Sequence, residues 1–160
     1  MFGVMTRELR FVAFRLVPET FLVDIMTVRQ IIPYAGSAHV PTAPSFVEGV
    51  IVVRNEVVPV VDLAVRLYPK TRERAEQPLI LLTYTPAGTI GLKVDEVRRM
   101  VTLRSDEILP APAMICGIRG EFLVGIAQYH DEVLLLLDVD TILTSDEQTQ
   151  LRDANLTPNA

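Results

Sequence analysis

The stretch Phe46-Val-Glu-Gly-Val-Ile-Val-Val-Arg-Asn-Glu-Val-Val-Pro-Val-Val-Asp-Leu63 contains two valine-rich runs separated by Arg54-Asn55. Short runs rich in Val and Ile that are bounded by turn residues are typical of buried β-strands. The two-residue connection predicts a hairpin, because Asn tolerates the positive φ that such turns favour. Pro59 lacks a backbone N–H, so we expect it at an edge or a bulge of its strand. The stretch therefore predicts a β-hairpin.

A similar hairpin pattern occurs 76 residues later in the chain. Alignment of Ser45–Leu67 with Glu121–Leu143 gives six identities in 23 positions, and most of the other positions are apolar in both segments. A second alignment, at an offset of 69, places Phe21–Ile32 on Ile90–Val101. Two such matches in the same order predict an internal duplication.

The other apolar residues also occur in short runs, such as Phe11–Leu16 and Leu79–Leu82, and long helical periodicity is nearly absent. We therefore expect a mainly β protein with short helical turns. The clearest helix candidate begins at Ser145, which offers an N-cap followed by acidic residues in the first turn. Because a unit of about 65–70 residues buries too little surface to be stable alone, we expect the two copies to pack together with a groove at their seam.

We expect one domain over residues 8–143, divided into two subdomains. The first covers about 8–68 and the second about 79–143, because the charged, proline-bounded segment 69–78 resembles a linker. Residues 144–160 are expected to form a C-terminal helix and tail, with Ala154–Ala160 disordered.

Composition limits the partners of the chain. Its 160 residues carry a formal net charge of −5, whereas nucleic-acid recognition normally needs a clustered basic surface. No apolar run approaches the roughly 18 residues of a membrane span. The first ten residues are charged where a signal peptide needs an apolar stretch, and Cys116 is the single cysteine. We expect a cytoplasmic protein that binds no nucleic acid and does not insert into the membrane.

The sequence contains no recognisable catalytic or metal-binding pattern. His39, His130 and Cys116 are too scattered for zinc, which needs closely spaced ligand pairs. Asp62 and Asp138 occupy matching positions of the repeat, so a shared role in the fold explains them better than catalysis does. We expect a protein that is not an enzyme and uses no cofactor or metal.

The stretch Phe46–Leu63 resembles the signature of the CheW family of chemotaxis coupling proteins, roughly F-I-x-G-V-I-N-L-R-G-x-V-V-P-V-I-D-L. Val94–Val97, Ser105–Pro112 and Phe122–Leu143 resemble further family segments, so the resemblance covers about Leu9 to Leu143. It implies two SH3-like five-stranded β-barrels. It also implies a scaffold, located at receptor arrays on the inner membrane, that joins the cytoplasmic tips of chemoreceptors to the regulatory domain of a CheA-type histidine kinase.

The resemblance also implies a receptor-binding groove between the barrels. Carried over residue by residue, it would be formed by Val28, Gln30, Ile31, Arg54, Val97 and Met100. In the family the arginine at the place of Arg54 pairs with a glutamate, but that position is Gln30 here. We therefore expect at best a hydrogen bond between Arg54 and a neutral amide, which is the weaker kind. The alternative is that the four apolar residues are ordinary core and Arg54 is a solvated turn residue.

The sequence departs from the family pattern at several places and leaves the partner open. Val52-Val53 and Asn55 replace the Asn-Leu and Gly of the signature, although Asn55 can still adopt the left-handed conformation. Arg29, Arg98 and Arg99 lie near the groove positions, either as a solvated face or as partners for acidic residues of a bound helix. The alternatives are a relative serving a different motility output, an SH3-like module with a non-chemoreceptor partner, and a small β-barrel enzyme.

Overall fold

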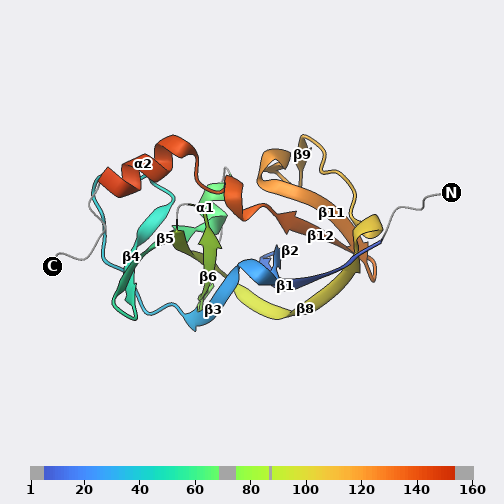
Figure 1. Ribbon diagram of the computed structural model, residues 1–160, viewed down its shortest axis with the longest axis horizontal. Coiled ribbons are helices and arrows are strands. Elements are labelled where there is room, and N and C mark those ends of the chain that lie inside the picture. The colour runs from blue at the N-terminus through green and yellow to red at the C-terminus, as the bar shows by residue number, and fades with distance from the viewer. Residues whose placement is uncertain (1–5, 69–74, 87, 154–160) are drawn as a thin grey trace.

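The computed structural model describes residues 6–68, 75–86 and 88–153, and it is built mainly from strands (Figure 1). In chain order the strands and helices are β1 (Glu8–Leu16), β2 (Glu19–Asp24), β3 (Val28–Pro33), β4 (Val47–Val53), β5 (Glu56–Asp62), α1 (Leu63–Leu67), β6 (Leu79–Thr85), β7 (Gly88–Val94), β8 (Glu96–Arg104), β9 (Met114–Ile115), β10 (Ile118–Arg119), β11 (Leu123–Tyr129), β12 (Glu132–Leu137) and α2 (Ser145–Asp153). Short 3₁₀ turns cover Ile25–Thr27, Ser105–Glu107, Gly120–Phe122 and Val139–Thr141.

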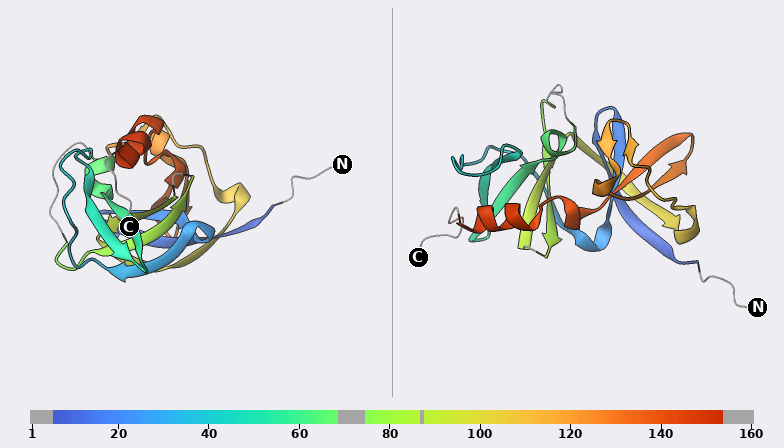
Figure 2. Two further views of the ribbon diagram at one scale, coloured as in Figure 1. Left: turned by 60° about the vertical axis from the view of Figure 1, so that its left-hand side comes forward. Right: turned by 90° about the horizontal axis from the view of Figure 1, so that it is seen from above.

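The strands form two five-stranded sheets and one small hairpin, β9–β10. The central sheet has the order β3-β6-β7-β5-β4, and the terminal sheet has the order β8-β1-β2-β12-β11. The two sheets curl side by side, and the left view of Figure 2 looks along the curl of the central sheet. The prediction of a mainly β fold with two five-stranded barrels is confirmed.

The sheets divide the chain differently from the expected subdomains 8–68 and 79–143. The central sheet is one continuous segment, Val28–Val94, whereas the terminal sheet joins β1 and β2 to the strands after Glu96. The first hairpin of the first copy, β1–β2, therefore joins the terminal sheet, and the first hairpin of the second copy, β6–β7, joins the central sheet. Each copy thus completes the sheet of the other. A repeat identifies similar segments but not which strands pair, so the sequence alone misplaced the boundary. The expected linker connects β5 and β6 of one sheet, and its residues 69–74 lie outside the described part of the chain.

The two repeated hairpins have the same backbone geometry. The turn residues Arg54 and Asn55 have φ values of 50° and 64°, and those of His130 and Asp131 are 48° and 64°. The expected hairpins are thus confirmed in both copies. Pro59 is at neither an edge nor a bulge, because β5 lies between β7 and β4 and the register shift with β4 comes at Val47–Gly49. It lies just before the point where β5 begins to pair with β7, so its missing N–H does not interrupt that ladder.

The core is largely shared between the sheets. Its largest cluster contains residues from both, among them Phe14 and Phe21 of the terminal sheet and Leu81 and Leu92 of the central sheet. Two smaller clusters each belong to one sheet. We call the large cluster the shared core, because it joins the two barrels at their seam.

The matching aspartates have the shared fold role expected from the repeat. The Asp62 side chain accepts a hydrogen bond from the Val65 N–H at the start of α1, and Asp138 accepts one from the Asp140 N–H at the next 3₁₀ turn. The predicted C-terminal helix is also present, but its cap is Thr144 rather than Ser145: the Glu147 N–H donates to Thr144 Oγ1 over 3.1 Å. Within the described residues, no helix has the length and apolar character needed to cross a membrane.

Candidate protein-interaction site

Two edge strands lie on the same side of the molecule, the lower side in Figure 1. β3 ends the central sheet and β8 ends the terminal sheet. They are also equivalent in the repeat, since an offset of 69 places Val28 on Val97. Five of the six predicted groove residues lie on these two strands, all except Arg54.

A bulge in β3 directs two of these residues to one face. Val28 lies opposite Thr83 and Ile31 opposite Leu81, with one extra β3 residue between the two pairs. Because side chains alternate along β6, Thr83 and Leu81 share a face, and Leu81 belongs to the shared core. Val28 and Ile31 therefore lie on the face that forms the seam.

The same irregularity occurs in β8. Val97 lies opposite Phe14 and Met100 opposite Val12, with a register shift between the two pairs. Phe14 and Val12 both belong to the shared core. Val97 and Met100 therefore also face the seam, from the other sheet.

The four apolar residues of the predicted groove differ in burial. Val28 and Val97 are half-buried and pack against the shared core. Ile31 and Met100 remain 42% and 56% exposed. Met26, in the turn before β3, is 81% exposed, and no sequence pattern had marked it. Each barrel thus offers one anchored and one exposed apolar side chain along its edge.

The two polar residues of the predicted site are not joined. Gln30 lies opposite Leu82, so its side chain is on the other face of β3 from Ile31. Arg54 is exposed in the turn between β4 and β5. Across the described chain, no hydrogen bond links Arg54 to Gln30, so the two residues do not form even the weaker contact that was expected at best.

A different ion pair connects β3 to that hairpin. Arg29 Nη1 donates to Glu56 Oε2 over 2.7 Å and lies 3.4 Å from Thr89 Oγ1, and its guanidinium is 6.0 Å from the centre of the Tyr84 ring. The hydrogen bond from Arg29 lowers the pKa of Glu56, and the same bond raises the pKa of Arg29. The sequence did not single out this pair, because its two members are 27 residues apart.

The other arginines near the groove also have partners within the chain. Arg98 Nε donates to Glu96 over 3.1 Å, and the Arg99 guanidinium lies 5.5 Å from the centre of the Tyr129 ring. A bound acidic helix would have to compete with these contacts.

Comparison with known proteins identifies the family. A family model described as CheW-like domain matches residues 10–147.

The chain belongs to the CheW-like family.

The relatives of this CheW-like chain agree. It is 32% identical to the chemotaxis protein CheW of Rhizobium meliloti over 142 residues, which is 89% of the chain and 90% of the relative. It is 28% identical to that of Klebsiella aerogenes, covering 86% and 82%. The solved structure of the scaffolding protein TtCheW from Thermoanaerobacter tengcongensis superposes with a TM-score of 0.80 at 25% identity, covering 88% of this chain and 91% of that one. The protein is a chemotaxis coupling scaffold.

The ion pair of Arg29 and Glu56 joins β3 to the β4–β5 hairpin. Arg54, at the tip of the same hairpin, is exposed.

The remaining candidate groups do not form a chemical site. Cys116 is exposed at the tip of β9–β10 with a positive φ of 53°. His130 is an exposed residue of the β11–β12 turn. In the part of the chain that the structure describes, no three His, Cys, Asp or Glu side chains come together as ligands for a metal ion.

Proposed function

We propose that the protein joins the cytoplasmic tips of chemoreceptors to the regulatory domain of a CheA-type histidine kinase, and that it does so by binding alone. The observation that supports this most directly is the pair of bulged edge strands, which aim Val28, Ile31, Val97 and Met100 at one seam.

A receptor helix suits this seam. An amphipathic helix can lay its apolar face in a groove, with Ile31 and Met100 as exposed contacts and Val28 and Val97 as the floor. Arg54 adds an exposed positive charge at the tip of the β4–β5 hairpin. Contacts of this kind are small and weak, at roughly less than 1,200 Å².

The kinase would use a different part of the protein. The strands β4 and β11 end the two sheets on the other side, and each is bridged at one point, by Ala38 and by Leu109. The rest of such an edge strand can pair with a related barrel. Binding receptor and kinase at separate places lets many weak contacts add up in an array at the inner face of the membrane. The protein would need no cofactor and no catalytic group for this role.

The proposal is tested by charge insertion at the exposed groove residues. We expect Ile31→Asp and Met100→Asp each to weaken binding of a receptor-tip fragment at least roughly tenfold, because a buried carboxylate has no partner in an apolar contact. Arg54→Glu is expected to weaken complex formation as well. The measurement is isothermal titration calorimetry with the tip fragment, in parallel with the kinase regulatory domain.

Val133→Asp is the matched control, because Val133 is 47% exposed on β12, which is separated from the groove strand β8 by β1 and β2. It should bind the tip as the wild type does. Retained binding of the kinase domain shows that the groove variants are folded. Wild-type affinity for the tip in both Ile31→Asp and Met100→Asp would refute the proposed groove.

A further inference from the structure

Arg66 contacts both barrels at the seam. Its guanidinium lies 4.3 Å from the centre of the Phe46 ring and 5.1 Å from that of Phe122. Phe46 directly precedes β4 of the central sheet, and Phe122 directly precedes β11 of the terminal sheet. These two rings are repeat equivalents and both belong to the shared core. One cation from α1 therefore lies against an aromatic pair that spans the seam.

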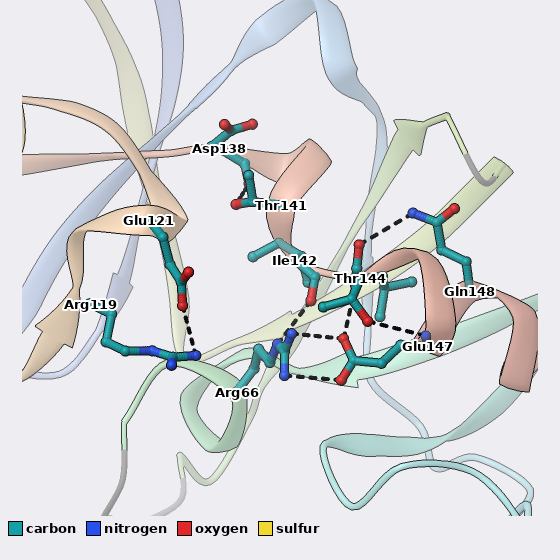
Figure 3. Close-up of polar contacts among 10 residues, drawn as sticks. Arg66, Arg119, Glu121, Asp138, Thr141, Ile142, Thr144, Glu147 and Gln148 are labelled. Atoms are coloured by element: carbon teal, nitrogen blue, oxygen red, sulfur yellow. Dashed lines mark hydrogen bonds and ion pairs between the residues drawn. The ribbon is translucent and has the colours of Figure 1, made fainter.

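Arg66 also binds the chain that leaves the terminal sheet (Figure 3). Its Nε donates to the carbonyl of Ile142 over 2.8 Å. Its Nη1 and Nη2 donate to the two carboxylate oxygens of Glu147 over 3.2 and 2.8 Å. The two side chains are only 14% and 18% exposed, so water competes little for this two-point pair.

Glu147 is at the same time part of the cap of α2. Its Oε1 accepts from the Thr144 N–H over 2.8 Å, while its own N–H donates to Thr144 Oγ1. This is a capping box. Through Glu147, Arg66 is bonded directly to the first turn of α2.

The repeat equivalent of Arg66 is Ile142, which is fully buried. Among the described residues, the equivalent position of the second copy therefore holds no arginine. The bonds of Arg66 are directional, as is the hydrogen bond from the Tyr68 hydroxyl to Glu19 of β2 over 2.6 Å. They add to the apolar burial of the shared core, which holds surfaces together without fixing their angle.

Arg66 and the groove lie on opposite sides of the molecule. Figure 1 shows α1 and α2 above, and β3 and β8 below. The only connections between the sheets in the described residues are Ile25–Thr27 and Asp95, which directly precede β3 and β8. The chain thus connects the two barrels beside the groove, and the bonds of Arg66 join them on the opposite side of the molecule.

We propose that Arg66 is a positioning residue for the groove, a role that rests on the proposed function. It sets the angle between the barrels, and hence the spacing of Ile31 and Met100, through its bonds to Glu147 and Ile142. Losing the clamp would let the barrels rock about the two connections, so the groove would fit a receptor helix less well.

The test measures the barrel spacing directly. Nitroxide labels are placed on cysteines at the exposed residues Thr42 and Thr102, one on each barrel, with the native cysteine removed by Cys116→Ser. Electron–electron spin distances are recorded for wild type, Arg66→Lys and Glu147→Gln. We expect one narrow distribution in wild type and broader distributions in both variants, with receptor-tip binding weakened roughly fivefold or more.

Arg119→Lys is the matched control. Arg119 also faces Phe122, at 5.3 Å, and pairs with Glu121 over 2.8 Å, but all three residues belong to one segment. It should leave both the distance distribution and tip binding unchanged. Glu147→Gln keeps the rings and Arg66 in place, so it reports on the clamp even if Arg66→Lys fails to fold.

The outcomes separate the two proposals. Wild-type distance distributions in folded Arg66→Lys and Glu147→Gln would overturn the clamp. Broader distributions with unchanged tip binding would overturn its link to the groove. If the wild type itself binds no receptor tip, the proposed function fails, and the role of Arg66 for the groove fails with it, while the distances still decide whether Arg66 fixes the barrel angle.

Discussion

The central and terminal barrels use the same backbone plan with different side chains. Glu56 and Glu132 occupy the same place after each hairpin turn. In the central barrel, Glu56 pairs with the charged Arg29, whereas in the terminal barrel Glu132 accepts a hydrogen bond from the hydroxyl of Thr20. Thr89, the repeat equivalent of Thr20, also lies beside Glu56, whereas Arg98, the equivalent of Arg29, pairs with Glu96 instead. The two barrels therefore share strand order, bulges, turns and the threonine–glutamate contact, while the partner of the arginine diverged.

The two barrels also fill their own cores differently. Leu136 lies opposite Leu22 in the terminal barrel, but the equivalent Val60 lies opposite Gly91 in the central barrel. A Cβ added at Gly91 would approach the Ile80 side chain to 2.8 Å. At this position the central barrel is therefore packed with smaller groups, and a side chain at Gly91 would collide with Ile80.

The largest loss of stability is expected from truncating a buried side chain in the terminal barrel's own core. Leu136 is 2% exposed, so Leu136→Ala should lower the free energy of unfolding by about 2–5 kcal/mol. Val60→Ala removes one carbon fewer, and we expect a smaller loss of about 2 kcal/mol. Urea denaturation measures both. An equal or larger loss for Val60→Ala would break the distinction between the two cores.

A second pair of substitutions tests the shared backbone. A Cβ at Gly49 would lie 2.5 Å from the carbonyl oxygen of Ala38, and one at Gly125 would lie 2.6 Å from that of Leu109. Ala38 and Leu109 form equivalent bridges to β4 and β11, so the space is closed by backbone in both barrels.

We expect Gly49→Ala and Gly125→Ala to destabilise the protein by about 1–3 kcal/mol each, and by similar amounts, because backbone cannot move aside as a side chain can. Thermal and urea unfolding of the two variants provide the measurement. A neutral effect at one site and a large effect at the other would show that the barrels differ in backbone as well as in side chains.

The smallest effect is expected at the Arg29–Glu56 pair. The folded pKa of Glu56 is lowered, so its contribution to stability is fully present above the ordinary value of 4.5 and is lost as the pH falls through the folded pKa. Glu56→Gln should therefore be less stable than wild type at neutral pH, and the two should converge in acid.

The check is a series of urea denaturations from neutral to acidic pH. As a control, Glu56→Gln is also made in an Arg29→Gln background, where the convergence should disappear because the donor is gone. If the free energies of unfolding of wild type and Glu56→Gln differed by the same amount at every pH, the stabilisation of the Glu56 carboxylate by Arg29 would be contradicted.

Much of the fold followed from local sequence. Valine-rich runs around Arg54-Asn55 and His130-Asp131 predicted both hairpins, and the paired offsets predicted the duplication. The exchange of the first hairpins did not follow, because β1–β2 and β6–β7 are similar enough to complete either copy. Strand pairing over long sequence separations depends on tertiary packing, which no local pattern encodes.

The candidate site was predictable to a similar extent. The repeat identified Val28 with Val97 and Ile31 with Met100, and the bulges then placed all four on the seam face. The role of Gln30 was not predictable, because the extra β3 residue turns it to the opposite face. Arg29, Glu56 and Arg66 were missed as partners because their contacts join segments distant in the chain.

The discontinuous terminal sheet has a consequence for synthesis on the ribosome. The first hairpin, β1–β2, emerges early, but its neighbours β8 and β12 are translated only after the whole central segment. The continuous segment Val28–Val94 has all its strand partners as soon as it leaves the exit tunnel. We therefore expect the central barrel to form while the nascent chain is still growing, with the opening hairpin waiting beside it until translation is nearly complete.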